Sequence, residues 1–147
     1  MRGALFNILG DLDNLTVLDP FGGTGALSFE AISRGATSAT TIEHDVVAQK
    51  TIEKNMHVLA LEKHINLIRA SAQSWLRTTD TQFDVVLCDP PYNNTQISLL
   101  AELTKRVHKD GIFVLSFPAS EEAPKEIKLQ LIKQQQYGDG QLFFYQA

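Results

Sequence analysis

The chain has 147 residues, 44% of them hydrophobic, which is the size and apolar content of one globular domain with a packed core. Its formal net charge of −4 excludes a strong attraction of the whole chain to phosphate backbones, so any contact with nucleic acid has to be local. No segment approaches the about 20 apolar residues of a membrane span. The single cysteine, Cys88, excludes an internal disulfide, and four scattered histidines give no spacing for a zinc site. We therefore expect one cytoplasmic domain over 1–147, without membrane or metal.

The first third of the chain alternates short β-branched runs with segments of helical period, as parallel strands joined by crossover helices do. The predicted elements are a helix at Ala4–Leu9, a strand at Thr16–Pro20, a glycine turn at Gly22–Gly25, a helix at Ala26–Arg34 and a strand at Ala39–Glu43.

A longer helix is predicted after Asp45, whose side chain suits an N-cap. Apolar residues near the helical period should bury one face of this helix, and charged residues should lie on the other. The residues expected to be buried are Val46, Val47, Ile52, Met56 and Leu59, and those expected to be exposed are Lys50, Glu53 and Lys54.

The middle of the chain continues the same alternation. The predicted elements are a strand at Ile65–Ile68, a short helix at Ser71–Leu76, an uninterrupted and central strand at Phe83–Cys88, a helix at Ile97–Val107, a turn at Asp110-Gly111 and a strand at Ile112–Phe117.

The C-terminal part of the chain departs from this alternation of strands and helices. A helix at Glu121–Ile127 is predicted to precede two strands, Leu129–Gln134 and Gln141–Tyr145, which are joined by the hairpin-type turn Tyr137–Gly140. Five βα-type units that end in a β-hairpin are typical of class I methyltransferases. The pattern therefore predicts an α/β, Rossmann-like fold with a mostly parallel seven-stranded sheet and an antiparallel C-terminal hairpin.

The segment Leu18–Gly25 (LDPFGGTG) places glycines between a strand and a helix, where a backbone without Cβ atoms can approach a nucleotide-like cofactor. A dinucleotide fingerprint fits poorly, because its third glycine would fall on Ser28. The candidate contacts of this turn are Phe21, Gly22, Gly23 and Gly25.

Two acidic residues favour S-adenosylmethionine as the cofactor. Asp19, at the end of the first strand, can accept hydrogen bonds from a cationic amino acid moiety, which a dinucleotide lacks. Glu43, at the end of the second strand, can accept hydrogen bonds from ribose hydroxyls. Ser71 and Ala72, after the third strand, are candidates for the adenine pocket. The alternative is that the glycine turn only makes a tight strand-to-helix connection.

The segment Asp89–Tyr92 (DPPY) leaves the carboxyl edge of the predicted fourth strand, where open α/β sheets carry their ligand crevice. Pro90 and Pro91 supply no N–H donors and fix the backbone, so their carbonyls and the Asp89 carboxylate form an array of acceptors. Such an array suits an exocyclic NH₂ group of a nucleic-acid base, and Tyr92 can stack on that base. The alternative is a structural Pro-Pro turn. Cys88 is expected to be a buried core thiol.

The chain resembles the bacterial 16S ribosomal RNA guanine-N2 methyltransferases of the RsmD type along essentially its whole length. The stretches that carry the resemblance are Arg2–Leu9 (RGALFNIL), Leu18–Ala36 (LDPFGGTGALSFEAISRGA), Thr41–Asp45 (TIEHD) and Asp89–Tyr92 (DPPY).

The resemblance implies a class I methyltransferase fold, S-adenosylmethionine as methyl donor, and a guanine amine in 16S ribosomal RNA as target, free or in the assembling small subunit. It assigns Asp19, Phe21, Gly23, Gly25 and Glu43 to the cofactor, and it assigns the segment Asp89–Tyr92 to the target base. Members of this family usually begin with a basic β-hairpin ahead of the first helix, and the sequence starts at that helix.

Two other functions stay open from the sequence. An adenine-N6 methyltransferase acting on DNA or RNA would use the same acceptors, although a DNA enzyme normally adds a target-recognition region. A non-catalytic nucleotide-binding module would keep the glycine turn without needing the intact Asp-Pro-Pro-Tyr segment.

Overall fold

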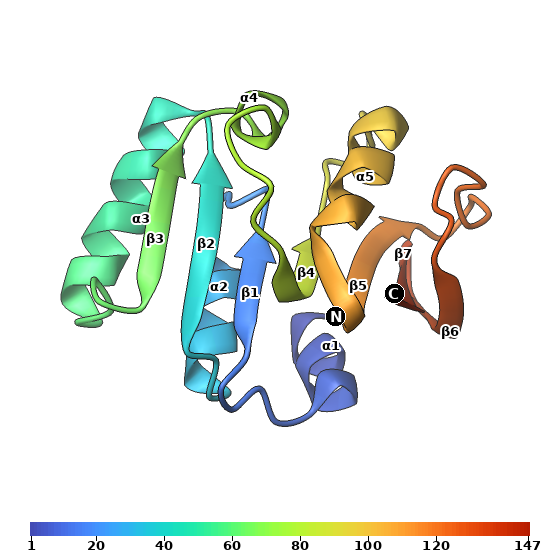
Figure 1. Ribbon diagram of the computed structural model, residues 1–147, viewed down its shortest axis with the longest axis horizontal. Helices are drawn as coiled ribbons and strands as arrows, with labels where there is room; N and C mark the ends of the chain where they lie inside the picture. Colours follow the sequence, from blue (N-terminus) through green and yellow to red (C-terminus); the bar gives the residue numbers. More distant parts are fainter.

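A computed structural model describes all residues, 1–147, and contains one seven-stranded sheet (Figure 1). The strand order is β3-β2-β1-β4-β5-β7-β6, with β1 to β5 parallel and β7 antiparallel to both of its neighbours. The strands are β1 (Thr16–Asp19), β2 (Ser38–Glu43), β3 (Ile65–Arg69), β4 (Phe83–Cys88), β5 (Val107–Pro118), β6 (Gln130–Tyr137) and β7 (Gly140–Gln146). The predicted fold class is confirmed, and β4 occupies the centre of the sheet as expected.

Helices cover both faces of the sheet. They are α1 (Arg2–Leu9), α2 (Ala26–Ser33), α3 (Val46–Val58), α4 (Ala72–Leu76), α5 (Ile97–Leu103) and the 3₁₀ turn η1 (Thr104–Arg106). The first three helices contribute Phe6, Ala31 and Ile52 to the hydrophobic core on one face, whereas α4 and α5 contribute Trp75 and Leu100 to the core on the other. None of these helices combines the length and the apolar character needed to cross a membrane.

Two helix starts are fixed by side-chain caps. The Asp45 carboxylate accepts a hydrogen bond from the Ala48 backbone N–H at 2.9 Å, which confirms Asp45 as the N-cap of α3. In the same way the Ser71 hydroxyl accepts a hydrogen bond from the Ser74 backbone N–H at 3.1 Å and caps α4. Both caps follow strands, so they set the angle at which each helix leaves the carboxyl edge of the sheet.

The prediction for the buried face of α3 is wrong at three positions. Ile52 and Met56 are buried, but Val46, Val47 and Leu59 are 59%, 73% and 53% exposed. At about 100° per residue, the two valines lie about 120° and 140° around the helix from Ile52, and Leu59 is already the C-cap. The helix therefore buries a narrower stripe than its apolar content indicates, whereas its three charged residues are exposed as expected.

The predicted helix at Glu121–Ile127 is absent, and the segment forms turns. Pro124 lies in its middle, where a proline removes a helical hydrogen bond and clashes with the preceding turn. In a helix the Glu121 carbonyl would accept a hydrogen bond from a backbone N–H of the next turn. Here it accepts a hydrogen bond from the Gln141 side-chain amide at 2.6 Å. The tail therefore reaches the hairpin without a covering helix.

Two boundaries around β5 also differ from the prediction. The helix expected at Ile97–Val107 ends at Leu103 and continues only as η1, and β5 begins at Val107. The predicted turn at Asp110-Gly111 is an irregularity inside this strand, where Asp110 has a φ of 68° and the register to β4 shifts. The strand is thus longer at both ends than Ile112–Phe117.

Candidate functional site

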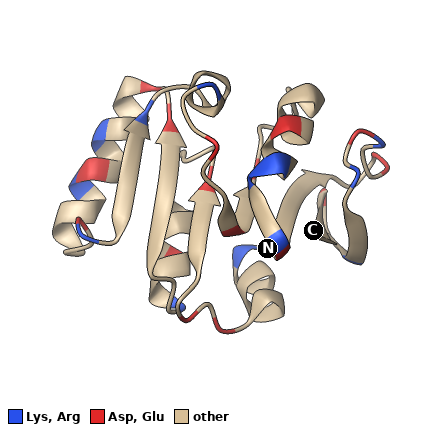
Figure 2. Cartoon of the chain, in the orientation of Figure 1, with Lys and Arg blue, Asp and Glu red and all other residues tan.

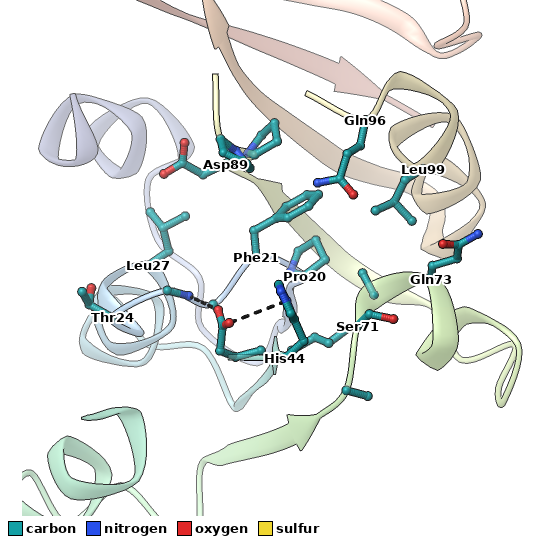
Figure 3. Close-up of a pocket in the computed structure, with 18 of the residues that line it drawn as sticks. Pro20, Phe21, Thr24, Leu27, His44, Ser71, Gln73, Asp89, Gln96 and Leu99 are labelled. Carbon is teal, nitrogen blue, oxygen red and sulfur yellow. Dashed lines mark hydrogen bonds and ion pairs between the residues drawn. The ribbon is translucent and has the colours of Figure 1, made fainter. Parts of the chain in front are cut away.

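A cavity of about 840 Å³ lies at the carboxyl ends of the central parallel strands (Figure 3). This volume is in the range of small-molecule and cofactor sites. Ten of the twelve residues that the sequence predicted for the site line the cavity. They are Phe21, Gly22, Gly23, Glu43, Ser71, Ala72, Asp89, Pro90, Pro91 and Tyr92. The fold therefore brings the glycine turn and the Asp-Pro-Pro-Tyr turn to one cavity.

The glycine turn is held to the second strand by hydrogen bonds. The Gly22 N–H donates to the Ile42 carbonyl at 2.8 Å, and the Gly23 N–H donates to Glu43 Oε1 at 2.8 Å. Gly23 has a φ of 57°, and a Cβ atom there would meet only the Phe21 carbonyl oxygen, at 3.8 Å, so the backbone faces the cavity without a side chain. This position fits the predicted close approach of backbone to a ligand.

Gly22 and Gly25 are required by packing inside the protein. A Cβ atom on Gly22 would lie 2.8 Å from the Thr41 methyl group. Gly25 has a φ of 84°, and a Cβ atom there would lie 2.9 Å from the Phe29 ring. Gly25 does not line the cavity.

We expect Gly25→Ala to lower the free energy of unfolding by about 2–5 kcal/mol, because overpacking costs about 1–3 kcal/mol and a left-handed non-glycine residue costs about 1–2 kcal/mol. Gly3→Ala is the matched control, since Gly3 lies in α1 with nothing within 4 Å of its added Cβ atom. Alanine in a helix interior is favoured by up to about 1 kcal/mol over glycine. Urea denaturation of both variants measures the difference, and equal stability of Gly25→Ala and the native protein would contradict the packing role.

Glu43 lies at the wall of the cavity and is 9% exposed. Its two carboxylate oxygens accept hydrogen bonds from the Gly23 and Asp45 backbone N–H groups, both at 2.8 Å. Its neighbour His44 places Nδ1 3.8 Å from Glu43 Oε2 (Figure 3). Because each carboxylate oxygen can accept a second hydrogen bond, Glu43 is held in place and still has capacity for a ligand hydroxyl.

Asp19 is fully buried and lies behind the cavity wall, so it does not line the cavity itself. Its Oδ2 atom accepts a hydrogen bond from the Ser28 hydroxyl at 2.8 Å, and Ser28 is 2.6 Å from the Thr41 hydroxyl. Its Oδ1 atom is buried without any partner. Burial raises the pKa of Asp19 to about 7, and the charges of Asp89 and Glu43 add to this effect. An unpartnered carboxylate oxygen of this kind fits a cation that is bound nearby.

The Asp-Pro-Pro-Tyr turn begins where β4 ends. Asp89 lines the cavity, and the partial burial of its carboxyl group by the surrounding protein raises its pKa above the ordinary value. Tyr92 is 38% exposed, and its hydroxyl lies 2.7 Å from the hydroxyl of Ser116 on β5. The ring of Tyr92 is therefore anchored through its hydroxyl, a contact that sequence reasoning did not predict.

Cys88 is a buried free thiol, as expected. Burial raises its pKa well above the ordinary value, and the charges of Asp19 and Asp89 act in the same direction. A thiol in this environment stays protonated and packs in the core. No group of three or more histidine, cysteine, aspartate or glutamate side chains could hold a metal ion.

Acidic residues gather at the carboxyl edge of the sheet, where Figure 2 shows red segments at the strand ends. Asp19 and Glu43 end β1 and β2, and Asp89 follows β4. The local charge of the cavity therefore favours a cationic ligand group over a phosphate.

Sequence reasoning missed several residues of the cavity wall. They include Met1, Pro20, Thr24, Leu27, His44, Gln73, Gln96 and Leu99. Gln96 has a φ of 54°, which is uncommon for a residue other than glycine, and its position before α5 gives no motif that would mark it. Three of the missed residues did carry a signal, because Pro20 and Thr24 lie inside the segment Leu18–Gly25 and His44 directly follows Glu43.

Comparisons with known proteins identify the family of the chain. The family described as "Conserved hypothetical protein 95" matches residues 1–146. Ribosomal RNA small subunit methyltransferase D of Escherichia coli is 33% identical over 112 residues, which are 76% of this chain and 54% of that protein. The chain thus spans about half the length of the curated relatives of this name that it matches.

Solved structures share the fold. A conserved hypothetical protein of Streptococcus pyogenes superimposes with a TM-score of 0.90 at 30% identity, over 100% of this chain and 95% of that chain. The structure of SMU.776 complexed with SAH superimposes with a TM-score of 0.79 at 17% identity, over 99% of this chain and 48% of that chain, which shows the fold alone. From the full-length family match and the curated relatives together, the chain belongs to the "Conserved hypothetical protein 95" family, that of the RsmD-type ribosomal RNA small subunit methyltransferases.

Proposed function

We propose that this chain transfers a methyl group from S-adenosylmethionine to the exocyclic N2 amine of a guanine in 16S ribosomal RNA. The observation that carries the proposal is that the Asp89–Tyr92 turn and the Glu43-bound glycine turn face one cavity. The names of the curated relatives support ribosomal RNA of the small subunit as the methyl acceptor.

The residues present fit S-adenosylmethionine. Glu43 at the cavity wall can accept hydrogen bonds from ribose hydroxyls, and the negative charge of Asp19, which is buried just behind that wall, can stabilise the cationic amino acid end. Ser71, Ala72 and Leu99 would surround the adenine. The bound cofactor supplies an electrophilic methyl group on its sulfonium sulfur.

Asp89 and the carbonyl of Pro90 would then hold the target amine. The nitrogen lone pair of a base NH₂ group is delocalised into the ring, and hydrogen bonds from its N–H groups to these acceptors favour a pyramidal nitrogen whose lone pair is free to attack. The stacked ring of Tyr92 would fix the plane of the base. After the transfer, the methylated nitrogen carries an acidic proton, which Asp89 can accept.

An adenine-N6 amine could make the same hydrogen bonds, so this acceptor is the alternative within the same mechanism. A non-catalytic module has less support, because the complete Asp-Pro-Pro-Tyr turn lies on the cavity wall. The nucleoside that receives the methyl group separates the two acceptors.

Calorimetric titration tests the cofactor assignment. We expect S-adenosylhomocysteine to bind and NAD to give no heat of binding, because the site offers carboxylates to a cation and no fitting pyrophosphate turn. Detectable binding of NAD without binding of S-adenosylhomocysteine, at a temperature where the protein is folded, would overturn the proposal.

A further inference from the structure

The hydroxyl of Tyr92 lies in a niche between β5 and β7. On β5, the hydroxyl of Ser116, which is 3% exposed, lies 2.7 Å from the Tyr92 hydroxyl. On β7, a Cβ atom at Gly140 would lie only 2.6 Å from the same hydroxyl oxygen, and 3.3 Å from the sulfur and the methyl carbon of Met1 at the start of the chain (Figure 1). The Tyr92 hydroxyl therefore has a hydrogen-bond partner on β5 and fills space that a side chain on β7 would occupy.

The register of the sheet places both niche residues on one face. Gly140 pairs with Pro118, and Leu142 pairs with Ser116, in the antiparallel ladder of β7 and β5. Side chains alternate along a strand, and directly opposed residues point to the same face of a sheet. Ser116 and the missing side chain of Gly140 therefore face the same way, toward the core that contains Leu142 and the buried residues of α1.

Gly140 is needed for space and not for its backbone conformation. It is buried in β7 and does not have the left-handed φ of Gly23 or Gly25, so an alanine could adopt its backbone. Its strand is paired on both sides, to β5 and to β6, whereas the Tyr92 hydroxyl is the end of a side chain that is 38% exposed. A Cβ atom at position 140 would therefore displace the Tyr92 ring and not the strand.

We propose that Gly140 and Ser116 are positioning residues of the target site, which together fix the Tyr92 ring as the platform for the target base. The glycine sets how close to the sheet the ring can lie, and the serine hydroxyl holds it there. The inference rests on the proposed function and deepens it. A ring that is ordered before the base arrives does not lose rotamer entropy on binding, so more of the stacking energy remains for the complex.

The C-terminal hairpin thereby gains a role in the site. None of the residues of β6 and β7 lines the cavity. Through Gly140, however, the first residue of β7 determines where a cavity-lining ring stands.

The position of the ring can be measured by NMR in the protein without RNA. A nuclear Overhauser effect is expected between the Tyr92 ring protons and the α protons of Gly140, one of which points along the direction of the missing Cβ atom. This effect should weaken in Ser116→Ala, because the ring loses its hydrogen bond. Tyr145→Phe is the matched control, since it removes a buried hydroxyl that has no hydrogen-bond partner, and it should leave the effect unchanged.

Single-turnover methyl transfer to 16S RNA gives the functional readout. Gly140→Ala should be about fivefold to 150-fold slower, the range for losing the stacking of one base. Ser116→Ala and Tyr92→Phe should each be about twofold to tenfold slower, which corresponds to one neutral hydrogen bond. The affinity for S-adenosylhomocysteine should stay the same in all three variants, and Gly3→Ala, whose Cβ atom meets nothing within 4 Å, should keep the native rate.

Double variants separate this role from a general effect on folding. Tyr92→Phe removes the oxygen that a Cβ atom at position 140 would meet, so Gly140→Ala combined with Tyr92→Phe should recover the rate of Tyr92→Phe alone. Ser116→Ala should cause no further loss in the Tyr92→Phe background, because the hydroxyl that it contacts is already gone. This second pair leaves the backbone of β7 unchanged and decides the question even if Gly140→Ala does not fold.

Losses that add up in the double variants, or a nuclear Overhauser effect of native strength in Ser116→Ala, would overturn the positioning role. The NMR measurement needs no methyl transfer. If the native protein transfers no methyl group while the effect still weakens in Ser116→Ala, the proposed function fails and the hydroxyl niche remains supported.

Discussion

Replacement of Asp89 by alanine is expected to slow methyl transfer by on the order of 100-fold or more and to leave the affinity for S-adenosylhomocysteine nearly unchanged. Asp89 is proposed to contact the target amine, and its hydrogen bonds strengthen only as that nitrogen becomes pyramidal. The loss should therefore appear mainly in kcat. The acidic group is exposed to the cavity, so the variant should also fold.

Single-turnover transfer of a labelled methyl group to 16S RNA, with calorimetry of S-adenosylhomocysteine, measures both quantities. Asp139→Ala is a suitable control, because Asp139 is an exposed aspartate in the β6–β7 turn that does not line the cavity. Full activity in Asp89→Ala would refute the mechanism, whereas an equal loss in the control would indicate a general effect of charge.

Asp19→Asn should stabilise the protein without ligand and weaken cofactor binding. The pKa of Asp19 is about 7 in the folded protein against 3.8 in the unfolded chain. Between these values the unfolded chain binds fewer protons, so the contribution of Asp19 to the free energy of unfolding falls as the pH rises through this window. The full difference corresponds to on the order of 4 kcal/mol. We expect the variant to be more stable than the native protein at pH 8 by up to this amount and similar to it at pH 4.

Cofactor binding should change in the opposite sense. Loss of the negative charge next to the cationic amino acid end costs about 1–3 kcal/mol, or about fivefold to 150-fold in Kd. In the native protein the affinity for S-adenosylhomocysteine should fall as the pH drops below about 7, because Asp19 becomes protonated, and in Asp19→Asn this dependence should be lost.

Urea denaturation at pH 4 and pH 8, together with calorimetry over the same range, tests both parts, with Asp139→Asn as a surface control. A variant with native affinity would remove Asp19 from the cofactor site. If the variant were less stable than the native protein at pH 8, the buried Asp19 carboxylate would not lower the free energy of unfolding, and this part of the account would be wrong.

The sequence predicts the strands well, and also which residues meet at one cavity, because both depend on local patterns. The parallel strands contain apolar runs, and two of them, β1 and β4, lead into segments with a signature of their own, Leu18–Gly25 and Asp89–Tyr92. Since parallel strands end at one edge of the sheet, these separate signatures had to meet in space. This reasoning needs no knowledge of side-chain packing.

What the sequence could not predict depends on contacts between distant segments. The hydrogen bond between the hydroxyls of Tyr92 and Ser116 joins residues 24 positions apart, and a serine inside an apolar strand carries no signal of its partner. The turn at Glu121–Ile127 likewise depends on Gln141, whose side chain engages a carbonyl 20 positions away. In the same way, the burial of Asp19 behind the cavity wall follows from the packing of Ser28 and Thr41 around it.

The most direct test of the proposed function is to incubate the protein with methyl-labelled S-adenosylmethionine and 16S RNA, free or in assembling small subunits, and to identify the labelled nucleoside. The proposed function predicts N2-methylguanosine in the native protein and almost no label in Asp89→Ala. Labelled N6-methyladenosine would contradict the guanine acceptor and retain the mechanism, and the absence of any labelled nucleoside, with S-adenosylhomocysteine bound, would contradict methyl transfer by this chain.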